Sequence, residues 1–107
     1  MEQPRWIEDP GHAWLSVPLD QYPDALDCGT GFGFMVEGFA MLEEDVEAAV
    51  FLDRHPEIST PGIPRQYVEN FPRNMPRMPE RFQAFGRERE EFRQVCERLH
   101  ARFQEVS

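Results

Sequence analysis

The sequence contains no lysine, so all eleven of its basic residues are arginine. It also lacks a run of about 18 apolar residues, which a membrane-spanning helix requires. Its opening, MEQPRWIEDP, resembles neither a secretory leader nor a transit peptide, and we therefore expect a cytoplasmic protein. The chain has 107 residues, 40% of them hydrophobic, which suffices for a single small domain with a buried core.

Cysteine is scarce as well, and the residues that commonly bind metals are scattered. Cys28 and Cys96 match no zinc or redox spacing, so we expect both to be buried thiols. His12, His55 and His100 fall on three different expected elements, and none is followed by a second histidine or cysteine at helical spacing. The GTGFG stretch lacks the spacing of a dinucleotide loop, and no serine has the setting of a hydrolase nucleophile. We therefore expect no catalytic residue, no metal, no cofactor and no enzymatic activity.

The formal net charge of −9 is distributed unevenly. Residues 1–53 contain twelve acidic residues and one arginine, a balance of −11, whereas residues 54–107 contain eight acidic residues and ten arginines, a balance of +2. Direct contact with nucleic acid requires clustered cations, so the acidic half cannot be such a surface. We expect instead a partner protein that itself has a basic nucleic-acid-binding surface.

The acidic half has the patterns of short strands and one short helix. Residues 12–19 (HAWLSVPL) favour a strand, and residues 20–27 are expected to form an acidic loop. Residues 31–36 and 39–43 each alternate in hydrophobicity and are separated by a Glu-Gly dipeptide, which is typical of a β-hairpin. Apolar residues at helical spacing then predict a helix over residues 44–54.

The second half begins with an extended segment and ends with the longest expected element. Residues 55–78 contain five prolines, which favours an arginine-bearing connector. The side chains expected to pack this connector are Tyr67, Phe71, Met75 and Met78. Residues 79–105 place apolar side chains at alternating steps of three and four, which predicts a long amphipathic helix. The expected fold is therefore α+β: one domain with a small antiparallel sheet of about three strands, a short helix and this C-terminal helix.

The stretch MLEEDVEAAVFL, residues 41–52, concentrates carboxylates and contains no basic residue. Acidic residues at a helix start are stabilised by the helix dipole, but they can also form a patch that faces a basic partner, or, less simply, a metal or catalytic site. The first two interpretations are compatible. The predicted partner-binding patch consists of Glu43, Glu44, Asp45 and Glu47, with Asp20, Asp24 and Asp27 nearby.

The apolar positions of the C-terminal helix also allow more than one interpretation. They can be the face that packs on the sheet, or that face together with a dimer contact. A long independent coiled coil is disfavoured by Gly86 and by Arg89, which falls within the seam. The seam residues that a second copy of the chain could contact are Phe92, Cys96, Leu99 and Phe103.

Two motifs in the first half carry a resemblance to a known group of proteins. DPGHAWLSVPL (residues 9–19) and LEEDVEAAVFL (residues 42–52) resemble the GHxWLxVP strand and LEEDxEAxxFL helix start of small uncharacterised bacteriophage and mobile-element proteins. The chain has Ala13 where those proteins have Gly, Met41 where they have Tyr, and Val46 where they have Cys. The resemblance covers residues 9–53 and implies a phage or prophage setting, hence a bacterial host cell, but no chemistry.

These observations favour an inhibitor that binds a host protein. Duplex DNA carries one negative charge per about 1.7 Å of axis, and carboxylates one helical turn apart stand roughly 5–6 Å apart, so acidic turns and loops can imitate a row of phosphates. The leading hypothesis is an anti-CRISPR-like inhibitor of a nucleic-acid-handling defence complex, which uses the acidic patch as a nucleic-acid mimic. The alternative is a homodimeric structural or adaptor module that uses the C-terminal helix seam.

Overall fold

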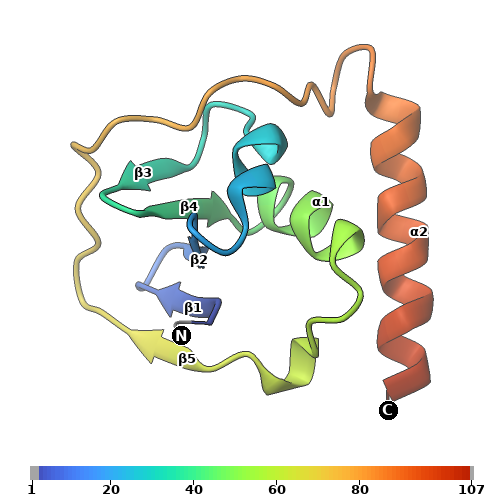
Figure 1. Cartoon of the computed structure of the whole chain (residues 1–107), viewed down its shortest axis with the longest axis horizontal. Coiled ribbons are helices and arrows are strands. Elements are labelled where there is room, and N and C mark those ends of the chain that lie inside the picture. Colours follow the sequence, from blue (N-terminus) through green and yellow to red (C-terminus); the bar gives the residue numbers. More distant parts are fainter. Residues whose placement is uncertain (1–2, 107) are drawn as a thin grey trace.

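The computed structural model describes residues 3–106, and their side chains through residue 103. A five-stranded mixed sheet has the strand order β3-β4-β2-β1-β5. Helix α1 lies between this sheet and the C-terminal helix α2, and a long connector runs from β5 around the sheet to α2 (Figure 1). The α+β class is therefore confirmed, but the sheet has five strands rather than about three. None of the helices in the described part of the chain is long and apolar enough to cross a membrane.

The predicted strand and hairpin of the acidic half are present. Strand β2 (Ala13–Pro18) pairs antiparallel with β4 (Phe39–Glu43), which pairs antiparallel with β3 (Phe34–Val36). Gly38 in the hairpin turn has a φ of 82°, a conformation that glycine adopts without steric cost. The loop predicted over residues 20–27 contains a 3₁₀ helix, η1 (Pro23–Cys28).

Sequence reasoning missed the two other strands. Strand β1 (Arg5–Glu8) pairs antiparallel with β2 on one side and parallel with β5 (Arg65–Tyr67) on the other, so the sheet is mixed rather than antiparallel. Strand β5 is short, fully exposed and follows the 3₁₀ helix η2 (Thr60–Gly62) inside the proline-rich connector. Its three residues, Arg-Gln-Tyr, have no alternation in hydrophobicity that would mark a strand.

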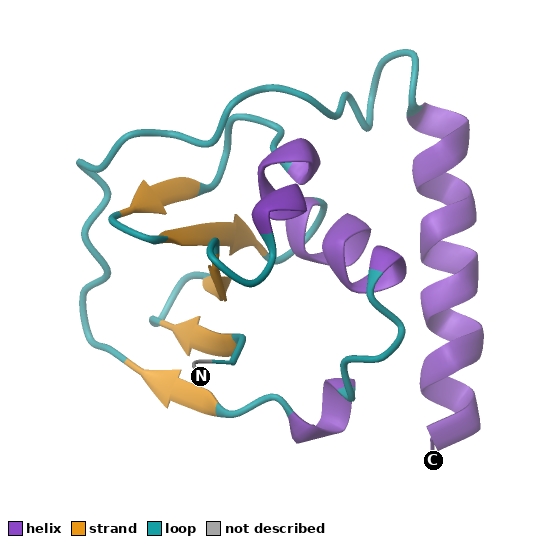
Figure 2. Ribbon diagram, viewed as in Figure 1, coloured by secondary structure: helices purple, strands orange, loops and turns teal. Residues whose placement is uncertain are grey.

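The sheet is covered on both faces. Its helix-side face buries Leu15, Val17 and Leu42 in a core that includes Phe51 of α1 (Glu47–Arg54). On the other face Trp14, Phe34 and Met41 pack with Phe71 from the connector, whose ring stacks on that of Trp14 with centroids 4.1 Å apart. The connector therefore acts as a cover for the second face (Figure 2). Phe71 and Met78 are buried as predicted and Met75 partly so, but Tyr67 is 63% exposed.

The C-terminal helix begins later than predicted. Helix α2 spans Arg89–Val106, whereas residues 80–82 pair with the loop after η1 and residues 84–88 form a turn. The backbone amides of Arg81 and Phe82 both donate to the carbonyl of Gly29, at 2.8 and 2.9 Å, and Glu80 forms a β-bridge with Thr30, so this segment is held in a non-helical conformation. This arrangement buries Phe82 against the core.

Helix α2 packs on α1 through a face that the heptad count identified only in part, because Leu99 and Phe92 of the predicted seam belong to it. Val95 and Leu99 are buried, whereas Cys96 is exposed. The Arg98 guanidinium donates two hydrogen bonds of 2.8 Å to Asp53 of α1, and Arg102 donates to the carbonyl of Leu52 at 2.8 Å. Cations at the end of α1 also stabilise its helix dipole. The buried face keeps the alternating steps of three and four but contains Val95 where the predicted seam has Cys96.

Candidate protein-binding surface

Glu43, the first acid of the predicted patch, closes the turn that leads into α1. One of its carboxylate oxygens accepts hydrogen bonds of 2.9 Å from the backbone amides of Asp45 and Val46. Burial raises the pKa of Glu43 above its ordinary value, although these backbone donors oppose the rise, and the Asp45 carboxylate increases it further. Glu43 therefore lies in the turn before α1, which begins at Glu47 rather than at residue 44 and has Glu47 as the acidic residue of its first turn.

Glu47 is fully buried, with 0% of its surface exposed. Its Oε2 accepts hydrogen bonds from the Thr30 amide at 2.7 Å and the Thr30 hydroxyl at 3.1 Å, and its Oε1 accepts one from the Glu43 amide at 2.9 Å. A buried carboxyl group needs such donors. Glu47 thus ties α1 to the end of β4 and to the loop after η1. The predicted patch therefore loses this residue, because a partner cannot reach it.

The loop aspartates do not form a common face. The Asp24 carboxylate contacts the Nε2 atom of His55 at 2.7 Å, and the Asp27 carboxylate pairs with Arg81 at 3.2 Å. Asp20 is exposed and has no ion pair within the described residues. Of the predicted patch, the carboxylates of Glu44 and Asp45 remain exposed beside one another at the start of α1. The acidic surface of this region is therefore smaller than the sequence suggested.

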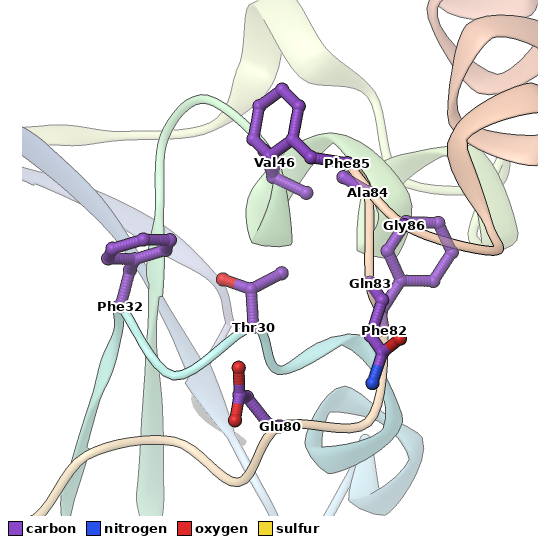
Figure 3. A pocket seen from close by; sticks show the side chains of 9 residues that line it. All are labelled: Thr30, Phe32, Val46, Glu80, Phe82, Gln83, Ala84, Phe85 and Gly86. Atoms are coloured by element: carbon purple, nitrogen blue, oxygen red, sulfur yellow. The ribbon is translucent and has the colours of Figure 1, made fainter.

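A cleft of about 230 Å³ lies beside Val46, the residue that follows this pair of acids (Figure 3). Phe32 lies on one side of Thr30, the ring of Phe85, from the turn before α2, lies next to Val46, and Glu80 lies at the end opposite Phe85. Phe32 is 60% exposed and Phe85 83% exposed. The Glu80 side chain forms no ion pair with any described residue. We call this feature the Phe32–Phe85 cleft; its lining is completed by Val46, Phe82, Gln83, Ala84 and Gly86.

A second hollow, of about 250 Å³, lies on the other side of Phe32. Here the chain supplies its own cations: Arg73 lies 5.4 Å from the centre of the Trp14 ring, and Arg77 lies 4.6 Å from that of Phe34. The Arg77 guanidinium also donates to the carbonyl of Phe32 at 3.0 Å. Phe32 therefore separates a hollow that contains arginines from a cleft whose lining contains none.

The predicted dimer seam is divided by the fold. Leu99 is buried and Phe92 is partly buried with its ring against Phe82, so neither can serve fully as a contact for a second copy. Cys96 and Phe103 are exposed. The expectation of two buried thiols is correct for Cys28 and wrong for Cys96, which turns away from α1.

Cys28 is the last residue of η1, and burial raises the pKa of its thiol to about 12. Among residues 3–106, no group of histidine, cysteine, aspartate and glutamate side chains is arranged to hold a metal ion. Neither observation points to a reactive centre. The exposed features of this region are instead aromatic and acidic, as in a surface that contacts another macromolecule.

Sequence reasoning missed the residues that form the cleft, because each seemed to belong to an element of its own. Phe32 fitted the alternation of the hairpin, Phe85 fitted the seam of the long helix, and Glu80 fitted its first turn. They converge only because residues 80–82 pair with residues 29–30 instead of starting a helix. Comparison of the chain with protein-family models, with curated proteins and with solved structures found no match.

Proposed function

We propose that this protein works by binding, and that it engages a basic surface of a partner protein through Glu44, Asp45 and the Phe32–Phe85 cleft. The observation that carries the proposal is the pair of highly exposed phenylalanines, which line one cleft near the start of α1, where Glu44 and Asp45 are exposed and form no ion pair among the described residues. Aromatic side chains that fill or flank pockets commonly dominate the binding energy of protein interfaces. Exposed acids at the rim increase the association rate with a basic partner and select against acidic ones.

The partner class that we propose is a nucleic-acid-handling defence complex of a bacterial host. Such complexes contain arginine- and lysine-lined channels, which complement an acidic surface, and the resemblance of residues 9–53 to phage proteins favours this setting. The small number of free carboxylates favours a local anchor at the rim of a basic channel over a long imitation of a phosphate row. The protein would then act as an anti-CRISPR-like inhibitor by steric and electrostatic obstruction.

Inhibition of purified defence complexes tests this proposal. We would titrate the protein against a panel of RNA-guided and DNA-binding nuclease complexes and measure the binding and cleavage of target DNA. We expect the protein to inhibit at least one complex stoichiometrically, and we expect this inhibition to weaken as the salt concentration rises. Absence of both binding and inhibition across the panel would contradict the proposed partner class.

A charge-matched pair of variants tests the surface itself. The double variant Glu44→Arg/Asp45→Arg and the control Glu37→Arg/Glu69→Arg both change the formal net charge from −9 to −5, because each substitution adds two units. All four side chains are exposed, so both variants should fold. We expect only the first to lose binding; equal loss in both would indicate an unspecific effect of net charge.

A homodimeric adaptor is the second candidate, and the exposed Phe103 and Cys96 on α2 favour it. The surface available to a second copy is narrower than the predicted seam, because Leu99 is buried in the core of its own chain. Light scattering tests it directly. A monomer at micromolar concentration would eliminate the adaptor and leave the inhibitor proposal unaffected.

A further inference from the structure

We infer that the Phe32–Phe85 cleft is a receptor for an arginine side chain of the partner, an inference that rests on the proposed function. Three sites among the described residues have an arginine over an aromatic ring. Arg65 lies 5.8 Å from the centre of the Trp6 ring, Arg73 lies 5.4 Å from that of Trp14, and Arg77 lies 4.6 Å from that of Phe34.

Each of these internal sites also satisfies the guanidinium with an oxygen acceptor. Arg65 pairs with Glu8, Arg73 pairs with Asp9 at 2.8 Å, and Arg77 donates to a backbone carbonyl. The combination is physically reasonable, because the ring face attracts the cation while the oxygen accepts its N–H groups. An aromatic face with an acceptor beside it is therefore the arrangement that binds arginine in this fold.

The Phe32–Phe85 cleft has the same parts but no cation. Two exposed rings and the Glu80 carboxylate line it, and Glu80 has no ion-pair partner among the described residues (Figure 3). The lining residues include no arginine and no histidine that would repel an incoming cation. Val46 adds apolar surface against which the methylene groups of a long side chain can pack.

The polar groups of the cleft favour arginine over other side chains. A carboxylate can accept two N–H groups of a planar guanidinium at once, and the plane can stack on a phenylalanine ring. A lysine ammonium is a compact, strongly hydrated point charge that makes neither contact as well. An aliphatic side chain would fill the cleft but would leave the Glu80 carboxylate without a counter-charge.

Binding of capped amino acids to the whole protein tests the inference without knowledge of the partner. We would titrate N-acetyl-arginine amide, its lysine equivalent and its citrulline equivalent, which has the shape of arginine without its charge, and follow backbone amide shifts by NMR. We expect arginine amide to shift the resonances of residues 30–33 and 80–86, and lysine and citrulline to bind more weakly by about tenfold. Equal shifts from citrulline and arginine, or shifts located at Trp14 and Arg77 instead, would overturn it.

Variants of the cleft provide the second arm. Glu80→Gln, Phe32→Ala and Phe85→Ala alter exposed side chains, and we expect each to reduce arginine-amide binding by about fivefold to tenfold. Tyr67→Ala is the matched control, since that ring is 63% exposed on β5, away from the cleft. Unchanged binding by all three cleft variants would overturn the inference.

The outcomes separate this inference from the proposed function. If a defence complex binds the three cleft variants as it binds the original protein but fails to bind Glu44→Arg/Asp45→Arg, the acidic surface functions and the arginine receptor is wrong. If arginine amide binds in the cleft but no complex of the panel is bound, the receptor is correct and the proposed partner class is wrong.

Discussion

Glu47 and Thr30 are joined twice: the buried carboxyl oxygen Oε2 accepts the Thr30 amide at 2.7 Å and the Thr30 hydroxyl at 3.1 Å. These bonds connect α1 to a loop seventeen residues earlier in the chain. Thr30 also lines the Phe32–Phe85 cleft, so the floor of the cleft is held by a residue that no partner can reach.

Replacement of Glu47 by alanine should therefore destabilise the whole domain. It leaves the amides of Thr30 and Glu43 without their acceptor in a buried environment, and we expect the free energy of unfolding to fall by about 2–4 kcal/mol. Urea denaturation followed by circular dichroism measures the change. The exposed neighbour substitution Glu44→Ala is the control, and an equal loss in both variants would contradict a special role for Glu47.

Gly33 should resist substitution for a related reason. A Cβ atom at this position would overlap the Glu47 carboxyl group and the carbonyl of Met41, so Gly33→Ala must displace the bonds just described. We expect a loss of about 1–3 kcal/mol in the free energy of unfolding. Gly11→Ala, whose added methyl group would meet only one atom, at 3.9 Å, should leave stability nearly unchanged in the same denaturation experiment.

His55 should make stability depend on pH. Its ring nitrogens contact Asp24 at 2.7 Å and Glu57 at 2.9 Å; although burial lowers the pKa of His55, these two carboxylates raise it above its ordinary value. Since the folded-state pKa is the higher one, the stabilisation is complete below the unfolded pKa of about 6.5 and disappears as the pH rises through the folded pKa.

The comparison of His55→Gln with the original protein tests this dependence. We expect the difference between their free energies of unfolding to be largest near about pH 6 and to shrink toward about pH 9. Urea denaturation at both pH values gives the two differences. A difference that stays constant, or that grows with pH, would contradict stabilisation of protonated His55 by Asp24 and Glu57.

The two cysteines should differ in reactivity. Cys96 is exposed on α2, whereas Cys28 is buried with a pKa of about 12 and is rarely a thiolate near neutral pH. We expect a maleimide reagent to add once to the native protein and twice after denaturation, as measured by intact mass. Cys96→Ser should abolish the native reaction; persistent labelling would show that Cys28 is accessible.

The packing of α2 leads to a further prediction about two adjacent residues. Val95 is 2% exposed against α1, so Val95→Ala should lower the free energy of unfolding by about 1–3 kcal/mol through lost contacts and a cavity. Cys96→Ala should have little effect, although the heptad count placed Cys96 and not Val95 at the contact. A larger loss of thermal stability in Cys96→Ala than in Val95→Ala would instead place Cys96 at the contact.

The parts of the fold that were predicted correctly are those determined by neighbours in the sequence. The hairpin follows from the alternation around Glu37-Gly38, and the helix after the acidic run follows from its apolar spacing. Residues 79–88 have an equally good helical pattern, yet they are extended or turned, and residues 80–82 pair with residues 29–30, about fifty positions earlier. No local pattern contains that information.

The same distinction applies to the candidate site. Glu43, Glu44 and Glu47 are chemically equivalent in the sequence, and they differ only in what other segments bring to them. Glu47 is buried and bonded to Thr30, Glu43 is half-buried in the turn to α1, and Glu44 is exposed. The cleft itself could not be predicted, because its two phenylalanines lie 53 positions apart on segments assigned to different elements.

The position of β1 inside the sheet has a consequence for the order in which the domain assembles. Strands β1 to β4 are neighbours or near neighbours in the sequence, whereas the parallel partner of β1 follows it by 57 residues. A chain that emerges from the ribosome can form the first four strands early, but one edge of β1 stays open until residues 65–67 arrive. Pairing strands so far apart in the sequence costs loop-closure entropy before any contact compensates for it, so the docking of β5, together with the covering of the sheet by Phe71, is expected to be the late step of folding.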